Sequence, residues 1–249
     1  MSEQDAACQH SKPLNRRAFL GSSLAMATIA SVAGGTLSGV VHAEALTKAQ
    51  REKLTPDAIL SLMKNGNKRF SRGKREDYNY LAQQRASAEG QHPMAVLLSC
   101  IDSRAPAETI MDLRIGDIFN NRVAGNIANP DILGGMEFAC KLSGAKVVLV
   151  MGHTACGAIK GAIDNAELGN LTGLLAKIKP AVAATTYSGE RTAKNYSFVD
   201  AVARKNVELT IAGIRKDSPV LAGMESSGAL KIAGAMYNLQ TGVVEFFGS

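Results

Sequence analysis

The sequence contains no tryptophan, and aromatic residues of all kinds make up only 5% of the chain. Proteins that bind nucleic acids combine a basic stripe with aromatic side chains on which bases stack. The formal net charge here is +6, but Lys and Arg are scattered, and no basic stripe interleaved with aromatic residues is present. The composition therefore excludes nucleic acid as an expected partner, and the short basic segment at residues 72–75 is interpreted as a solvated turn.

Cysteine is also scarce. The chain has four cysteines, and Cys8 lies in an N-terminal segment that we expect to be removed. The remaining three do not form the disulfide framework of a small secreted protein. Cys140 lies in an amphipathic helical pattern at residues 133–142 and is predicted to be a small buried hydrophobe. The other two, Cys100 and Cys156, stand beside further metal-binding residue types.

The N-terminus lacks the long uninterrupted apolar run that a permanent membrane anchor needs. Its apolar stretch, residues 24–41, is rich in Ala, Gly, Ser and Thr and only weakly hydrophobic. It follows Arg16 and Arg17 and ends at Ala43 in a small-residue cleavage pattern. These features predict a twin-arginine signal peptide over residues 1–43, and hence a periplasmic or otherwise exported protein with no stable membrane span after cleavage. A retained anchor is the alternative.

The remaining chain shows no internal repeat, and its length suits one domain with a sizeable core. Apolar runs at residues 93–99 and 146–152 are typical of strands that are covered on both faces. Helical patterns alternate with such runs. We therefore expect residues 44–249 to form a single α/β domain with a mainly parallel central β-sheet flanked by helices.

Both ends of this domain have distinct patterns. Residues 44–75 predict an N-terminal helical arm, whose main helix starts at Thr55 and Pro56 and carries an apolar stripe. At the other end, residues 230–237 and 243–247 are apolar and flank a turn sequence, which predicts a closing β-hairpin.

Two short segments carry the chemistry. One reads C-I-D-S-R from Cys100 to Arg104, and the other reads H-T-A-C from His153 to Cys156. Each follows one of the two apolar runs, and sites in parallel sheets are built at the carboxyl ends of adjacent strands. Cys156 would then start a helix, where unpaired N–H groups favour a thiolate. Zinc takes sulfur, imidazole nitrogen and carboxylate oxygen, so the two segments predict a zinc site.

The alternative is that Cys100 and Cys156 are ordinary core thiols and that His153 is a buried or helix-capping residue. The occurrence of both segments in one chain favours the metal site.

These residues resemble the beta-class carbonic anhydrases, which carry C-x-D-x-R followed later by H-x-x-C. The similarity continues through residues 122–126 and 152–158 and covers the chain from about residue 55 to residue 247. The resemblance implies an enzyme, a carbonate dehydratase, that reversibly hydrates carbon dioxide to bicarbonate and a proton by attack of zinc-bound hydroxide.

The resemblance also implies residue roles. Zinc would be held by Cys100, His153 and Cys156, with Asp102 and Arg104 as a catalytic pair. Arg104 keeps the carboxylate ionised and aimed, so that Asp102 can accept a hydrogen bond from the nucleophile. In a closed form of such enzymes, Asp102 instead leaves the arginine and becomes the fourth zinc ligand.

Gln91, nine positions before Cys100, matches the family glutamine that hydrogen-bonds substrate. A regulatory bicarbonate pocket in some members uses a tryptophan where this chain has Leu97, so the tryptophan-dependent pocket is absent, although Arg122 matches its arginine. In the family the helical arm packs on a neighbouring subunit, which implies a homo-oligomer, either a dimer or a tetramer.

Two other functions stay open at this stage. The same zinc site could hydrolyse carbonyl sulfide or carbon disulfide, although no long insertion after Val182 suggests a narrow hydrophobic tunnel. The chain could also be a non-catalytic zinc-binding protein in which Asp102 stays on the metal. Retention of Arg104 argues against that, because a structural site needs no competing partner for the carboxylate.

Overall fold

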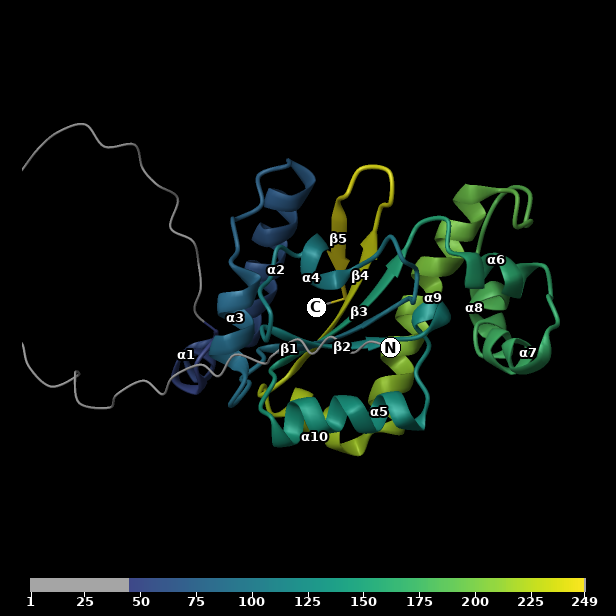
Figure 1. Ribbon diagram of the computed structural model, residues 1–249. Helices are drawn as coiled ribbons and strands as arrows, with labels where there is room; N and C mark the ends of the chain where they lie inside the picture. The colour runs from purple at the N-terminus through teal and green to yellow at the C-terminus, as the bar shows by residue number, and fades with distance from the viewer. Residues whose placement is uncertain (1–44, 249) are drawn as a thin grey trace, which may run out of the picture. The chain divides into compact units, whose positions relative to one another are not determined.

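The computed structural model describes residues 45–248, so the expected signal peptide lies outside the described residues. A five-stranded sheet of order β2-β1-β3-β4-β5 forms the centre (Figure 1). The pairs β2–β1, β1–β3 and β3–β4 are parallel, and β5 runs antiparallel to β4. The prediction of a mainly parallel α/β sheet is confirmed. The strands are β1 (Ala95–Ser99), β2 (Ile118–Arg122), β3 (Val147–His153), β4 (Lys231–Tyr237) and β5 (Val244–Phe247).

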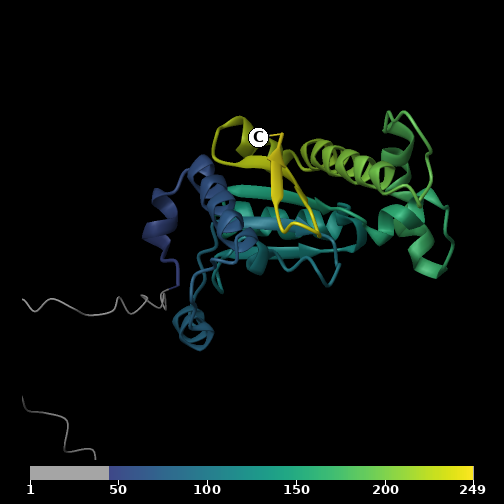
Figure 2. The same cartoon turned by 90° about the horizontal axis from the view of Figure 1, so that it is seen from above.

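Helices cover both faces of the sheet because side chains alternate along each strand. On β3, Val148 and Val150 join the core cluster that contains residues of α5, α6 and α9, whereas Val147, Leu149 and Met151 join the cluster with α2 and α4. Figure 2 shows α9 extending from the α6–α8 segment toward the β4–β5 hairpin. The helices are α1 (Lys48–Lys53), α2 (Pro56–Ser71), α3 (Tyr80–Ser87), α4 (Ala107–Ile110), η1 (Ala124–Asn126), α5 (Pro130–Glu137), the π-helical turn η2 (Phe138–Leu142), α6 (Gly157–Ile163), α7 (Gly169–Ala176), α8 (Lys179–Ala184), α9 (Tyr196–Asp217) and α10 (Pro219–Ser226).

The predicted arm is helical but is not free of the domain core. Thr55 caps α2 by accepting the N–H of Ala58, with a proline in its first turn, as the sequence predicts. Ile59, Leu60 and Met63 are buried and belong to the core cluster on this chain's own sheet. The expectation that this apolar stripe packs on a neighbouring subunit is therefore wrong for α2. A long amphipathic helix buries its stripe on the nearest uncovered sheet face, which here belongs to the same chain.

The β4–β5 hairpin confirms the prediction for residues 230–237 and 243–247. The helices α7 and α8 are separate, because a proline in the first turn of α8 cannot continue the preceding helix. Among residues 45–248, no helix combines the length and apolarity that a bilayer crossing requires.

Candidate metal centre

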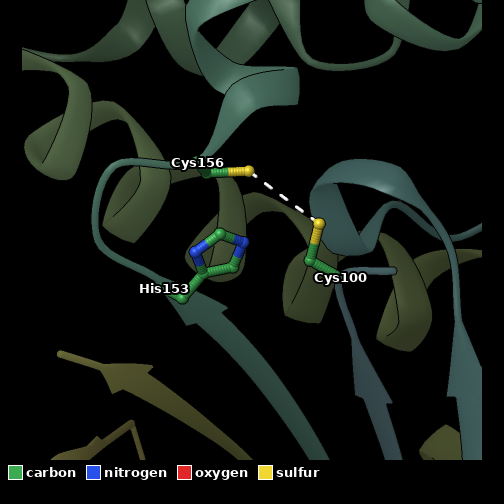
Figure 3. Close-up of side chains that lie close together, drawn as sticks. All are labelled: Cys100, His153 and Cys156. Carbon is green, nitrogen blue, oxygen red and sulfur yellow. Dashed lines mark hydrogen bonds between the residues drawn. The ribbon is translucent and has the colours of Figure 1, made fainter. Parts of the chain in front are cut away.

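Two adjacent parallel strands and one helix start bring the predicted ligands together. Ser99 on β1 pairs with Met151 on β3, so the chain leaves both strands at the same edge, where Cys100 and His153 stand. Cys156 is the N-cap residue of α6. One ligand atom from each of these three buried residues lies within 4.8 Å of the other two (Figure 3). The structure thus places the predicted ligands in one cluster.

The spacing of the two sulfur atoms fits a shared zinc ion. The Cys100 and Cys156 Sγ atoms are 4.0 Å apart. Two thiolates on one tetrahedral zinc, each at about 2.3 Å, are separated by about 3.8 Å. A disulfide would require about 2.05 Å. The observed separation therefore suits two ligands of one metal ion and is too long for a covalent bond.

The imidazole of His153 has its Nε2 atom available to bind a metal ion. Its Nδ1 lies 2.9 Å from the carbonyl oxygen of Thr154, which can only accept, so Nδ1 carries the proton. Nε2 then has a free lone pair, and it is buried with no hydrogen-bond partner among the described residues. A metal-ligating histidine commonly donates its other ring N–H to a carbonyl in this way. This unsatisfied atom supports the assignment of His153 as a ligand.

The two thiols differ in acidity. Hydrogen bonding between the sulfurs lowers the pKa of Cys100 and raises that of Cys156. Gly125 adds to the first effect by directing its N–H at the Cys100 sulfur, 3.4 Å away. Cys140 behaves as a core residue, because burial raises its pKa to about 12. Within the cluster, Cys100 is therefore the more readily ionised thiol, and a soft metal bound by both sulfurs would displace the thiol proton that remains.

Asp102 lies beside the cluster and is held by Arg104. The guanidinium donates from Nε to Oδ1 at 2.9 Å and from Nη2 to Oδ2 at 2.7 Å. These bonds hold the pKa of Asp102 well below its usual range. Oδ2 is 3.8 Å from His153 Nε2, which is too long for a hydrogen bond. The carboxylate is therefore ionised, aimed at the cluster and paired with arginine.

Arg122 supports the same turn from outside. It donates from Nε to the Cys100 carbonyl at 3.0 Å and from Nη2 to the Asp102 carbonyl at 2.6 Å. Leu97, which occupies the position of the family tryptophan, is fully buried. In this structure Arg122 thus binds backbone oxygens and fixes the turn that carries a ligand and the carboxylate.

Gln91 is not brought to the cluster within this chain. It precedes β1, whereas Cys100 follows it, and a strand of five residues is roughly 16 Å long. Gln91 is exposed and lines a surface cavity with Ser87 and Gly116. Its predicted contact with substrate stays a prediction, one that requires a second copy of the chain.

Two residues that the sequence does not predict support the ligands from elsewhere in the chain. Asn206 on α9 donates to the Gly125 carbonyl at 2.7 Å and so holds the peptide that faces Cys100. Asp200, also on α9, accepts the N–H of Ala155 at 2.8 Å. Their only sequence signal is a polar side chain on the otherwise apolar face of an amphipathic helix.

Known proteins are similar to this chain in sequence and in fold. A family model described as "Carbonic anhydrase" matches residues 95–244. "Carbonic anhydrase 2" of Mycobacterium tuberculosis is 33% identical over 189 residues, which is 75% of this chain and 90% of the relative. A carbonic anhydrase of Mycolicibacterium smegmatis is 31% identical over 196 residues, 76% of this chain and 92% of that protein.

A solved structure agrees with these relatives. The beta-carbonic anhydrase CafA of Aspergillus fumigatus is 29% identical, covers 77% of this chain and 89% of its own, and superposes with a TM-score of 0.59. One of two beta-carbonic anhydrases from Sordaria macrospora, described as tetrameric, is 26% identical with a TM-score of 0.57, covering 65% of this chain and 84% of its own. The chain therefore belongs to the carbonic anhydrase family and, within it, to the beta class.

Proposed function

We propose that this protein catalyses the reversible hydration of carbon dioxide to bicarbonate and a proton, with Zn²⁺ held by Cys100, His153 and Cys156. The observation that carries the proposal is the position of Asp102, ionised and held by Arg104, beside three buried ligand atoms. A structural zinc site has no need of such a pair. When bound, zinc is a Lewis acid that lowers the pKa of a coordinated water.

The chain's own residues orient the reaction. Asp102 accepts a hydrogen bond from the attacking oxygen, which leaves a lone pair of that oxygen directed toward the carbon of carbon dioxide. Because Arg104 keeps Asp102 strongly acidic, the carboxylate does not retain the released proton, which passes to buffer. The three ligand side chains are buried, and hydrogen bonds made in such surroundings are stronger than in bulk water.

Stopped-flow hydration of carbon dioxide by zinc-quantified protein tests this function. The same sample is assayed for hydrolysis of carbonyl sulfide, because the residues present suit attack on either linear molecule. Hydration that depends on zinc supports the proposal. Carbonyl sulfide turnover without hydration would replace it, and stoichiometric zinc with neither activity would indicate a non-catalytic site.

We propose that the protein is a homo-oligomer in which Gln91 serves the site of a second copy. Substrate binding by this residue requires a second copy, because Gln91 lies at the far end of β1 from Cys100. Ile101, between Cys100 and Asp102, is 60% exposed, as expected where a partner covers the mouth of the site. A dimer is the smallest assembly that meets this requirement, and the Sordaria relative is tetrameric. Sedimentation at decreasing concentration, with activity followed in parallel, tests whether the separated subunit is inactive.

Export by the twin-arginine route is proposed from the sequence of residues 1–43. N-terminal sequencing of the exported protein should begin at Glu44, and replacing Arg16 and Arg17 by lysine should leave the precursor in the cytoplasm uncleaved. Uncleaved protein in the membrane would indicate a retained anchor instead.

A further inference from the structure

The turn between two of the ligands has an unfavourable backbone conformation. His153 is the last residue of β3, and Cys156 caps α6, so Thr154 and Ala155 alone separate them. Ala155 has φ +55°, in the left-handed region that residues with a side chain rarely adopt. This conformation turns the chain sharply enough for both ligands to face one point. Something outside the turn must therefore stabilise it.

Asp200 supplies that stabilisation. Its Oδ1 accepts the N–H of Ala155 at 2.8 Å, and a carboxylate makes a stronger hydrogen bond than a neutral acceptor. Asp200 lies in α9 beside Val199, and both Val199 and Val202 are fully buried in the main core. The carboxylate is thus attached to a rigid element packed on the sheet, and it reaches across to a turn far away in sequence.

The N–H and the hydroxyl of Thr154, the other residue of the turn, are held by another element. The N–H of Thr154 donates to the Tyr237 carbonyl at 3.0 Å, and its Oγ1 accepts the N–H of Leu239 at 3.0 Å. Both partners belong to β4 or to the loop after it. Thr154 is therefore fixed by the sheet, while the hydrogen bond to Ala155 comes from α9. Without Asp200, the N–H of Ala155 would lose its partner, and the peptide could rotate toward a commoner conformation.

We propose that Asp200 is a positioning residue for the metal centre. By holding Ala155 in its left-handed conformation, it fixes the direction of the Cys156 sulfur relative to His153 Nε2. Asp200 touches neither ligand atom and acts only through the turn. Outer partners that orient metal ligands typically change metal affinity by 10- to 100-fold when removed. The proposal rests on the zinc site of the proposed function.

The test measures zinc affinity by chelator competition, and ligand geometry by the absorption of the Co²⁺-substituted protein. Asp200→Ala should weaken zinc binding by about 10- to 100-fold and alter the thiolate-to-cobalt bands. Asp200→Asn should retain much of the affinity, because its amide oxygen can accept the same hydrogen bond. Ala155→Gly added to Asp200→Ala should recover part of the loss, because glycine adopts positive φ without strain.

Asp217→Ala, an exposed acid at the end of the same helix, is the matched control and should bind zinc like the wild type. Unchanged affinity in Asp200→Ala would overturn the inference. So would equal weakening in Asp200→Asn, or no recovery with Ala155→Gly, because either result would assign the effect to charge or to general stability. Zinc binding by the wild type is measured first. Failure of the wild type to bind zinc would overturn the proposed metal site itself.

Discussion

Arg104 donates two parallel side-chain hydrogen bonds to Asp102, Nε to Oδ1 at 2.9 Å and Nη2 to Oδ2 at 2.7 Å. The backbone N–H of Arg104 adds a third, to Oδ1, also at 2.9 Å. Such a fork leaves the carboxylate one orientation. The site therefore divides its work between two groups of residues. The buried cluster of Cys100, His153 and Cys156 is suited to bind a metal, and Asp102 is placed to orient the reacting oxygen.

Asp102→Ala tests this division of tasks. We expect kcat/KM for carbon dioxide hydration to fall by about 100-fold or more, because the positioned hydrogen-bond acceptor that orients the attacking oxygen is lost. Zinc content should stay near the wild-type value, since Asp102 is outside the ligand cluster. The measurement pairs stopped-flow kinetics with metal analysis. Full activity in Asp102→Ala would show that the carboxylate has no part in the reaction.

Thiol reactivity should report the metal ligands directly. In a Cys8→Ser background, zinc-loaded protein should show no rapidly reacting thiol, and chelation of zinc should release one, Cys100, because its hydrogen bond with Cys156 lowers its pKa. Cys140 should stay slow in both forms, because it is buried and its pKa is raised to about 12. Chelation that leaves the count of rapid thiols unchanged would contradict the assignment of the ligands.

Gln91 should act on the site of a second copy. We expect Gln91→Ala and Cys156→Ser each to be strongly impaired alone. Mixed and reassociated in equal amounts, they form heterodimers in which one site has both an intact metal cluster and an intact Gln91. Random association would restore about a quarter of wild-type activity. If Gln91 instead served its own chain, mixing would restore none, and the activity would be the sum of the two variants.

Stability toward acid should depend on the pair Arg215 and Glu225. Arg215 donates to both carboxylate oxygens, at 2.7 and 2.9 Å, and these bonds lower the pKa of Glu225 below its usual value of 4.5. A lowered pKa contributes stability above the unfolded value, and this contribution is lost as the pH falls through the folded value. The pair should therefore stabilise the protein most at neutral pH.

Thermal unfolding of wild type and Arg215→Met at matched pH measures the contribution of this ion pair to stability. The difference in midpoint should be largest near neutral pH and should shrink as the pH falls below about 4.5. Subtraction at each pH removes the effect of metal loss that both proteins share. A difference that is constant across this range would show that the ion pair has no role in acid stability.

Two helical glycines make a matched test of packing. A Cβ on Gly66 of α2 would lie 1.8 Å from the carbonyl oxygen of Met111, whereas one on Gly213 of α9 would meet no atom within 4 Å. Gly66→Ala should destabilise the protein by about 1–3 kcal/mol in denaturant unfolding, through overpacking. Gly213→Ala should stabilise it by about 0.5–1 kcal/mol. Equal effects of the two changes would contradict the close contact between α2 and the turn after α4.

The sheet and the ligand cluster could be predicted because their signals are local. Continuous apolar runs marked β1 and β3, and ligand residues directly follow β1 and end β3. The rule that sites form at the carboxyl ends of parallel strands then placed Cys100 beside His153. The cap at Thr55 and the β4–β5 hairpin could likewise be predicted from a few consecutive residues.

The contacts that could not be predicted join residues far apart in the chain. Asp200 and Asn206 act on turns formed long before them in sequence, and no spacing rule connects a residue of α9 with Ala155 or Gly125. The packing of α2 on its own sheet was missed for a related reason. An amphipathic stripe shows that a helix face is buried, but it does not show which surface covers that face.

The most direct test of the account follows carbon dioxide hydration while zinc is added back to metal-free protein, over a range of pH, with Cys156→Ser treated identically. We predict that activity rises in proportion to bound zinc until each chain holds a single ion, that it increases with pH, and that Cys156→Ser gains little. Stoichiometric zinc binding by the wild type with no hydration at any pH would contradict this prediction.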